Sequence, residues 1–268
     1  MAGGVARVRG IEMAYDDVGS GAAAVVLLHG FPFDRSMWRE QTQALGGASR
    51  VIAPDLRGMG ETPSGDGALT MGEMAEDVAA LLDALNVERV VVGGLSMGGY
   101  VAFEFFSRFR ERVRGLVLAD TRPQADTDEA RHTREETAQR ALRDGLEPIA
   151  DSMLPKLLSA STREGKPDVV GRVRAMMLGT RPEGAAAALR AMAVRRDQTG
   201  LLTEVDVPTL IVVGGEDSIT PPSDAEAMGA KIRGSRLVRI EGAAHLSNVE
   251  RPEEFNRALV EFVGGLPT

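Results

Sequence analysis

Short, continuous apolar segments alternate with helical patterns along most of this chain. Ala24–Leu28, Val90–Val92 and Gly115–Ala119 consist of apolar residues, as expected of strands covered on both faces of a sheet. Thr70 and Glu73 form a capping box before an apolar stripe with helical spacing. That stripe consists of Met74, Val78, Leu81, Leu82 and Leu85. Strands that alternate with helices in this way predict a parallel sheet with helices on both faces.

Five further segments bring the candidate strands to eight. Val5–Arg9 and Ile11–Tyr15 predict an antiparallel pair that turns between them, at a glycine. The other three are Arg50–Ala53, Thr209–Val213 and Arg236–Ile240. The sequence therefore predicts an α/β fold with a mostly parallel, eight-stranded sheet.

The alternation stops after the sixth strand. Residues 121–204 contain helical stretches punctuated by prolines but no convincing strand. A segment this long is not a simple connection between two strands. We therefore expect a core formed by residues 1–120 and 205–268, with a helical cap at 121–204 inserted after the sixth strand.

Composition and charge exclude several classes of function. The net charge of −8 and the pI of about 5.1 speak against nucleic-acid binding. The chain has no cysteine, which excludes disulfides, thiolate catalysis and iron–sulfur clusters. It has only three histidines, without metal-ligand spacing, and no glycine-rich nucleotide loop follows a strand. We therefore expect no metal and no cofactor.

The first seven residues lack the apolar stretch of a secretory signal. The longest apolar run, at residues 22–28, is far too short to span a membrane. The expected location is the cytoplasm, without membrane association. Composition leaves the choice between monomer and dimer open.

The motif Gly-Leu-Ser-Met-Gly at residues 94–98 has the form G-x-S-x-G. It follows a predicted strand and begins a predicted helix, the context in which this motif forms a nucleophile elbow. Ser96 is the candidate nucleophile, and the flanking glycines avoid clashes at a sharp turn. Met97 and Phe31 are the candidate N–H donors to an oxyanion. Phe31 belongs to the loop His-Gly-Phe-Pro at 29–32, where Gly30 lets the backbone approach a substrate and the proline has no N–H to offer.

His245 is the best candidate for the catalytic base. It lies just after the last predicted strand, at the sheet edge where ligands bind in such folds. His132 lies in a charged helical stretch and is expected to be solvated. His29 is expected to brace the loop at 29–32.

Asp217 is the candidate acid, because it follows the strand before His245 and completes the chain order Ser, Asp, His. Glu216 and Asp120 are alternatives. Asp120 ends the sixth predicted strand, a position that also faces the cleft. Asp55 is expected to brace its own turn through Arg57.

These motifs resemble those of the α/β-hydrolase superfamily. The resemblance is carried by residues 29–32, 54–60, 94–99, 215–217 and 242–245, and it extends over 5–120 and 205–265. Within the superfamily the chain resembles small bacterial carboxylesterases and 3-oxoadipate enol-lactonases. One departure is Met59, where the family often has histidine. The resemblance implies a triad of Ser96, Asp217 and His245, with Phe31 and Met97 as oxyanion donors.

The expected activity is hydrolysis of small carboxylic esters with short-to-medium acyl chains through an acyl-enzyme. A lactonase, such as an enol-lactone hydrolase, is the alternative, because the same machinery serves both substrates. A non-catalytic protein that binds a small ligand is a third possibility. Met153 and Met177 of the cap are candidates for the acyl pocket, although such residues more often pack helices. Trp38 either walls the cleft or packs the first helix.

Overall fold

One eight-stranded sheet forms the centre of the computed structural model, which describes residues 2–21, 23–65 and 68–267. Residues 1, 22, 66–67 and 268 of the expected core lie outside the described residues. The strand order is β1-β2-β4-β3-β5-β6-β7-β8. The strands are β1 (Ala2–Val8), β2 (Ile11–Val18), β3 (Ala23–Leu28), β4 (Ser49–Pro54), β5 (Val90–Leu95), β6 (Val113–Ala119), β7 (Thr209–Gly214) and β8 (Arg236–Ile240).

The direction of pairing agrees with the sequence pattern. β1 and β2 form an antiparallel hairpin, and β2 pairs antiparallel with β4. All the remaining pairs, from β4 to β8, are parallel. The prediction of a mostly parallel, eight-stranded sheet is confirmed.

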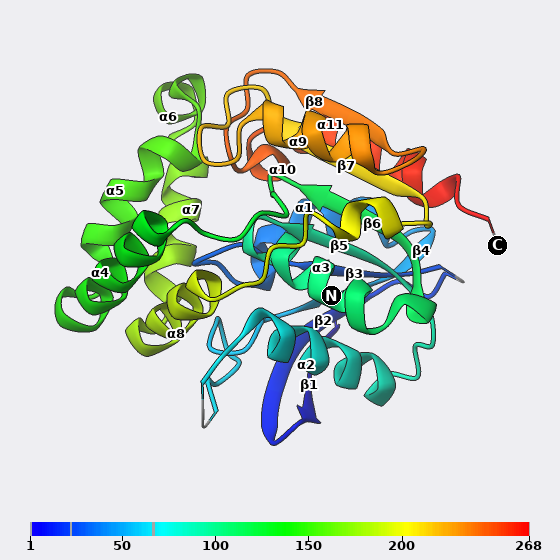
Figure 1. The fold of residues 1–268 in the computed structure, drawn as a ribbon, viewed down its shortest axis with the longest axis horizontal. Coiled ribbons are helices and arrows are strands. Elements are labelled where there is room, and N and C mark those ends of the chain that lie inside the picture. The colour runs from blue at the N-terminus through cyan, green and yellow to red at the C-terminus, as the bar shows by residue number, and fades with distance from the viewer. Residues whose placement is uncertain (1, 22, 66–67, 268) are drawn as a thin grey trace.

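Helices cover both faces of this sheet (Figure 1). Along β3, Val25 and Leu27 belong to one hydrophobic cluster, whereas Val26 and Leu28 belong to the other. This is the alternation of a strand that is buried on both sides. The first cluster includes residues of α1 and α11, and the second includes residues of α2, α3 and α9. These helices are α1 (Arg39–Leu45), α2 (Met71–Ala84), α3 (Met97–Arg108), α9 (Pro222–Lys231) and α11 (Pro252–Gly264).

The predicted helix start at Thr70 is confirmed. Its hydroxyl accepts a hydrogen bond of 3.1 Å from the Glu73 N–H and so caps α2. Of the predicted apolar stripe, Met74, Val78, Leu81 and Leu82 are fully buried against the sheet side of the helix. The stripe therefore positions α2, and α3 packs beside it.

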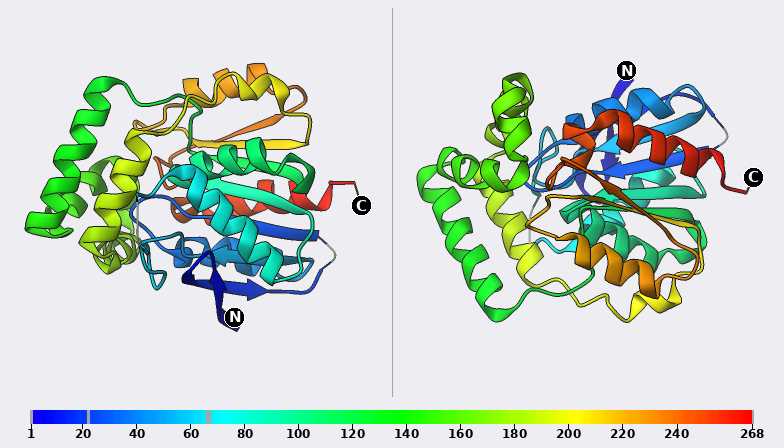
Figure 2. Two further views of the ribbon diagram at one scale, coloured as in Figure 1. Left: turned by 60° about the horizontal axis from the view of Figure 1, so that its bottom comes forward. Right: turned by 90° about the horizontal axis from the view of Figure 1, so that it is seen from above.

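A helical region is inserted between β6 and β7, as predicted. Between residues 120 and 208 of the described chain, every regular element is a helix. Figures 1 and 2 show these helices grouped at one end of the sheet, where β6 ends. They are α4 (Asp128–Asp144), α5 (Glu147–Leu157), α6 (Ala160–Gly165), α7 (Pro167–Gly179) and α8 (Pro182–Ala193), followed by the short 3-10 helix η3 (Leu201–Glu204). Prolines lie in the first turns of α5, α7 and α8, where the missing N–H costs little.

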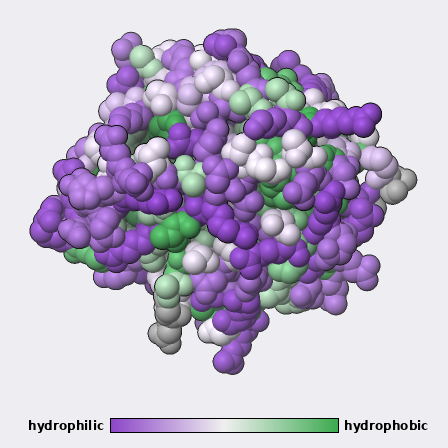
Figure 3. Space-filling view, viewed as in Figure 1, coloured by the Kyte–Doolittle hydropathy of each residue, from purple (hydrophilic) through white to green (hydrophobic). Residues whose placement is uncertain are grey.

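None of the described helices is long and apolar enough to cross a bilayer. On the face drawn in Figure 3, side chains are mainly hydrophilic, and hydrophobic groups occur in small, scattered patches.

Candidate active site

Ser96 occupies a strained turn between β5 and α3. Its φ and ψ angles are 55° and −113°, and a positive φ is uncommon for a residue with a side chain. Two contacts to the end of β6 hold this backbone in place. The Ser96 N–H donates to the Ala119 carbonyl at 3.0 Å, and the Thr121 hydroxyl donates to the Ser96 carbonyl at 2.9 Å.

The glycines of the motif leave room for this turn. A Cβ atom on Gly94 would lie 2.1 Å from the Gly98 carbonyl oxygen. A Cβ atom on Gly98 would lie 2.0 Å from the Leu28 carbonyl oxygen. Both contacts are with backbone, which cannot rotate away as a side chain can. Gly98 is therefore a steric requirement of the approach of α3 to β3, and Gly94 is one of the turn between β5 and α3.

The structure brings Ser96, His245 and Asp217 together in one hydrogen-bonded chain. The Nε2 atom of His245 lies 2.9 Å from the Ser96 Oγ, and its Nδ1 atom lies 2.8 Å from Asp217 Oδ2. His245 and Asp217 are both 3% exposed. An Nδ1–H that donates to the carboxylate leaves Nε2 free to accept the serine proton.

Asp217 is fixed by more than the histidine. Its Oδ1 atom accepts hydrogen bonds from the N–H groups of Ile219 and Thr220, and its Oδ2 atom accepts one from the Thr220 hydroxyl at 2.8 Å. Burial acts to raise the pKa of Asp217, but the bond and charge of His245 and the bonds from Thr220 hold that pKa below its ordinary value. The carboxyl group is therefore kept ionised beside the imidazole.

The alternative acids and bases lie elsewhere. Glu216 is exposed, and His132 keeps 78% of its side chain exposed while pairing with Glu136. Asp120 is buried, but its carboxyl group accepts from the Gly214 N–H and the Ser247 hydroxyl. The structure therefore brings Asp217, and not Asp120, into hydrogen-bond contact with His245.

The loop after β3 passes close to the serine. An ideal Cβ atom on Gly30 would lie 3.5 Å from the Ser96 Cβ, so the backbone of this loop approaches the nucleophile directly. Within the described chain, the N–H groups of Phe31 and Met97 donate no hydrogen bond. Met97 is also the first residue of α3, where the helix dipole favours negative charge. Two free donors beside a serine are what an oxyanion requires.

His29 braces this loop, in agreement with the interpretation of the sequence. Its Nε2 atom accepts a hydrogen bond of 2.9 Å from the Leu56 N–H, and its Nδ1 atom lies 2.9 Å from the Gly30 carbonyl. This pattern requires a neutral ring with the proton on Nδ1. Burial lowers the pKa of His29, and the charges of Asp55 and Asp34 oppose this only in part.

This buried histidine predicts a pH dependence of stability. Because the pKa of His29 is lower folded than unfolded, the unfolded chain binds more protons below pH 6.5, and unfolding becomes easier as the pH falls from 7 towards 5. One such group contributes a slope of at most about 1.4 kcal/mol per pH unit. Urea unfolding between pH 5 and 7 should therefore give a shallower slope for His29→Gln than for the wild type. His132→Gln, which changes an exposed histidine, should keep the wild-type slope. Equal slopes for His29→Gln and the wild type would contradict the prediction.

The expected partner of Asp55 was wrong. Asp55 braces its turn by accepting from the backbone N–H groups of Arg35 and Glu61 and by pairing with the Arg35 guanidinium. Arg57 instead reaches across to Asp77 on α2, at 2.6 Å. Arg57 and Asp55 are neighbours in sequence, but the turn directs their side chains to different elements.

The three side chains suggested for substrate binding, those of Trp38, Met153 and Met177, differ in how deeply they are buried. Trp38 is fully buried, and its ring packs 5.9 Å from that of Phe255 on α11, which corresponds to the packing interpretation and not to a wall of the cleft. Met177 is also fully buried, in the cluster that includes residues of α5 and α7. Met153 on α5 is half-buried and contacts both hydrophobic clusters. Of these two cap methionines, only Met153 is partly exposed in the described chain.

Several supporting residues were not found from the sequence. The Thr220 hydroxyl donates to the Asp217 carboxylate, and the Thr121 hydroxyl donates to the Ser96 carbonyl. Both threonines lie close in sequence to candidate residues, Asp217 and Asp120, but their types alone did not mark them as partners. Glu250 is fully buried and accepts from the Ala244 N–H at 2.6 Å and from the Ser159 hydroxyl at 2.7 Å. It thereby joins the loop of His245 to the inserted helices. No spacing signal in the sequence connects Glu250 with Ser159, 91 residues away.

The inserted helices also contact the other side of the site. The Thr180 hydroxyl donates to the Pro32 carbonyl in the loop after β3 at 2.9 Å. On the side of His245, the Leu246 N–H donates to the Leu157 carbonyl at 3.1 Å. The insertion is therefore bonded to both loops that flank Ser96.

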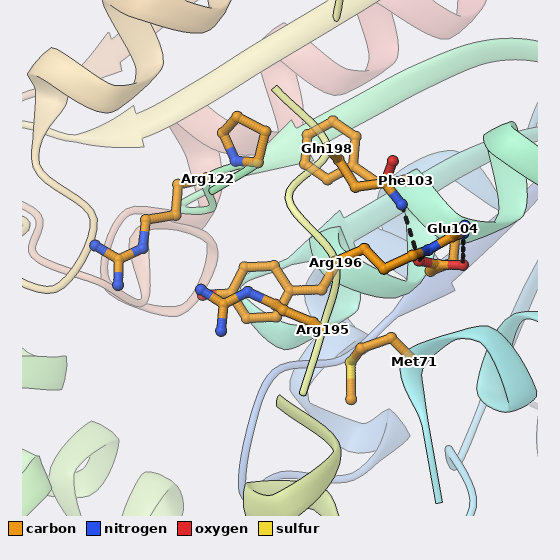
Figure 4. A pocket seen from close by; sticks show the side chains of 9 residues that line it. Met71, Phe103, Glu104, Arg122, Arg195, Arg196 and Gln198 are labelled. Carbon is orange, nitrogen blue, oxygen red and sulfur yellow. Dashed lines mark hydrogen bonds and ion pairs between the residues drawn. The ribbon is translucent and has the colours of Figure 1, made fainter. Parts of the chain in front are cut away.

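A separate, small hollow of about 10 Å³ lies beside α3 and does not include the triad (Figure 4). Its charged groups are paired with one another or with Asp126. Arg196 and Gln198 donate to Glu104, as the dashed lines show, and Arg195 pairs with Asp126 at 2.6 Å. The bonds to Glu104 connect the end of the insertion to α3, whereas the Arg195–Asp126 pair joins two parts of the insertion, and we assign the hollow a structural role. In the described part of the chain, no group of three acidic or histidine side chains is arranged to hold a metal ion.

A Ser–His–Asp chain at the carboxyl edge of a mostly parallel sheet places the protein among the α/β hydrolases. Comparison with known proteins agrees: residues 23–252 match the family model described as alpha/beta hydrolase fold, and the chain belongs to that family. A thermophilic esterase from Thermogutta terrifontis is 42% identical, with a TM-score of 0.96 and full coverage of both chains. The 3-oxoadipate enol-lactonase 1 of Acinetobacter baylyi is 30% identical over 90% of this chain and 89% of its own. A pimeloyl-[acyl-carrier protein] methyl ester esterase of Neisseria meningitidis is 32% identical over 90% of this chain and 93% of its own.

Proposed function

We propose that this protein is a serine carboxylesterase acting on small carboxylic esters with short-to-medium acyl chains. The observation that carries the proposal is the continuous chain from Ser96 Oγ through His245 to Asp217, together with the backbone N–H groups of Phe31 and Met97, which have no partner among the described residues. The similarity to an esterase from Thermogutta terrifontis over the full chain supports it.

The mechanism follows from this geometry. His245 takes the proton of Ser96 while the serine oxygen attacks the ester carbonyl. The N–H groups of Phe31 and Met97 donate to the oxyanion that forms. His245 then protonates the leaving alcohol, which leaves an acyl group on Ser96. A water molecule, deprotonated by His245, releases the acid and restores the serine.

The inserted helices supply the acyl pocket in this proposal. Met153 is the residue we assign to it, because it is half-buried beside the described core clusters. A thioether side chain adapts to ligands of varied shape. We therefore expect tolerance of several acyl chains, with no strict selection for one.

Lactone hydrolysis is the second candidate. The similarity to a 3-oxoadipate enol-lactonase of Acinetobacter baylyi supports it, as does the similarity to an enol-lactonase from Burkholderia xenovorans at 30% identity and a TM-score of 0.91. A lactone is a cyclic ester, so the same serine, base and oxyanion donors serve both reactions.

A substrate series separates these functions. We expect p-nitrophenyl esters from acetate to palmitate to be hydrolysed, with kcat/KM highest for short or medium chains and lost in Ser96→Ala. Turnover of lactones far above that of all linear esters would replace the esterase proposal by a lactonase. Absence of any Ser96-dependent hydrolysis, together with stabilisation by small apolar ligands, would instead indicate a non-catalytic binding protein.

A further inference from the structure

The end of β6 touches all three loops that carry the triad. It consists of Ala119, Asp120 and Thr121, and the mechanism above uses none of them. Ala119 and Thr121 hold the backbone of Ser96 from both sides, through its N–H and its carbonyl. This tripeptide begins with the last residue of β6, the strand that pairs with both β5 and β7, so it is central among the three loops.

Asp120 extends the connection to the loops of the acid and the base. Its Oδ1 atom accepts from the Gly214 N–H at 2.8 Å, three residues before Asp217. Its Oδ2 atom accepts from the Ser247 hydroxyl at 2.5 Å, two residues after His245. One carboxyl group therefore bonds to the loops on both sides of the Asp217–His245 hydrogen bond.

Two features of Asp120 lower the stability of the folded protein. Asp120 has a positive φ of 43°, and it is only 1% exposed. A strained backbone and a buried carboxyl group both disfavour folding, and such strain gathers at functional sites. Burial and the nearby charge of Asp217 also raise the pKa of Asp120 well above its ordinary value. A residue that served packing alone would be better replaced by an apolar one.

We propose that Asp120 is a positioning residue that holds the loops of Asp217 and His245 in catalytic register, while Ala119 and Thr121 hold Ser96 in the same frame. The inference rests on the proposed function. It assigns no contact with the substrate to Asp120, which acts through Gly214 and Ser247. The expected signature is a fall in kcat with little change in KM, because the reacting groups are misplaced while the substrate pocket is intact.

The test compares variants that break one or both bonds. Asp120→Ala removes both acceptors, Ser247→Ala removes only the bond to the base loop, and Asp120→Asn keeps the size and one acceptor. A misplacement of about 1 Å costs on the order of 100-fold in rate, and we expect Asp120→Ala to lose about that much in kcat. Ser247→Ala should lose less, Asp120→Asn should recover most of the activity, and the double alanine variant should be no worse than Asp120→Ala.

A second readout is independent of turnover. The Nδ1 proton of His245 in its bond to Asp217 is measured by ¹H NMR in the protein without substrate. Asp120→Ala and Ser247→Ala should shift or broaden this resonance, and Asp120→Asn should largely restore it. The control is Asp77→Asn, which alters a buried aspartate on α2 that pairs with Arg57. It should lower Tm and leave both kcat per folded molecule and the resonance unchanged.

The outcomes distinguish the two proposals. Wild-type kcat and an unshifted resonance in Ser247→Ala and in folded Asp120→Ala would overturn the positioning role. Should Asp120→Ala fail to fold, Ser247→Ala and Asp120→Asn decide in the same way. A wild type that lacks Ser96-dependent hydrolysis would overturn the proposed function, while the resonance would still report whether Asp120 orders the two loops.

Discussion

Replacement of Ser96 by alanine is expected to lower kcat for p-nitrophenyl acetate by about 10⁵-fold, because it removes the nucleophile and leaves only the oxyanion donors and binding. Folding should not suffer. The variant loses the hydrogen bond between the Ser96 Oγ and His245, but the backbone N–H and carbonyl of residue 96 keep their bonds to the end of β6. Initial rates and Tm are measured on the same preparation.

Ser107→Ala is the matched control for this variant. Ser107 is an exposed serine on the same helix, α3, and its loss should change neither kcat nor Tm. An aryl phosphonate should label the wild type and the Ser107 variant at one site per chain, and should leave Ser96→Ala unlabelled. Retained hydrolysis or labelling in Ser96→Ala would show that the nucleophile lies elsewhere.

Gly98→Ala is expected to destabilise the fold by about 3–5 kcal/mol, a loss typical of severe overpacking and backbone strain. The new Cβ atom would lie 2.0 Å from the Leu28 oxygen and 2.9 Å from the His29 oxygen, and both are backbone atoms. To accept it, α3 must move away from β3, and the hydrophobic contacts between them are lost. The free energy of unfolding in urea measures the effect.

Gly171→Ala serves as the comparison. This glycine lies inside α7, is exposed, and has open space where a Cβ would be. The same substitution should there stabilise the protein by about 0.5–1 kcal/mol, because alanine is the better helix former. If Gly98→Ala were as stable as the wild type to within about 1 kcal/mol, the contact between α3 and β3 would be looser than the distances indicate.

Most of the fold could be predicted from local pattern. Continuous apolar runs identified the buried strands, and the stripe from Met74 to Leu85 with its cap at Thr70 identified α2. These features depend on residues within one element. The order of serine, aspartate and histidine after three strands then selected Ser96, Asp217 and His245, because parallel strands bring their carboxyl ends to one edge of the sheet.

What was missed depends on contacts between distant segments. Asp55 pairs with Arg35 and not with Arg57, two residues away. The turn directs the side chains of Asp55 and Arg57 to different elements, so their closeness in sequence does not predict their partners. Trp38 has its partner, Phe255, on the last helix. The role of Glu250 also needs the folded structure, since Ser159, which donates to its carboxyl group, lies 91 residues away in the chain. No periodicity records such pairs.

The bonding of the inserted helices has a consequence for protein engineering by exchange of segments. Because the insertion leaves the sheet after β6 and returns before β7, a foreign segment could be substituted there without altering any strand pair. Glu250 limits that freedom, since it is fully buried and receives two of its hydrogen bonds from Ser159. A graft without donors at that point would leave a buried carboxylate partly unsatisfied, a defect that commonly costs several kcal/mol. Chimeras that keep residues 157–159 with the recipient should therefore fold and retain the position of His245, whereas those that replace them should fail first at the catalytic base.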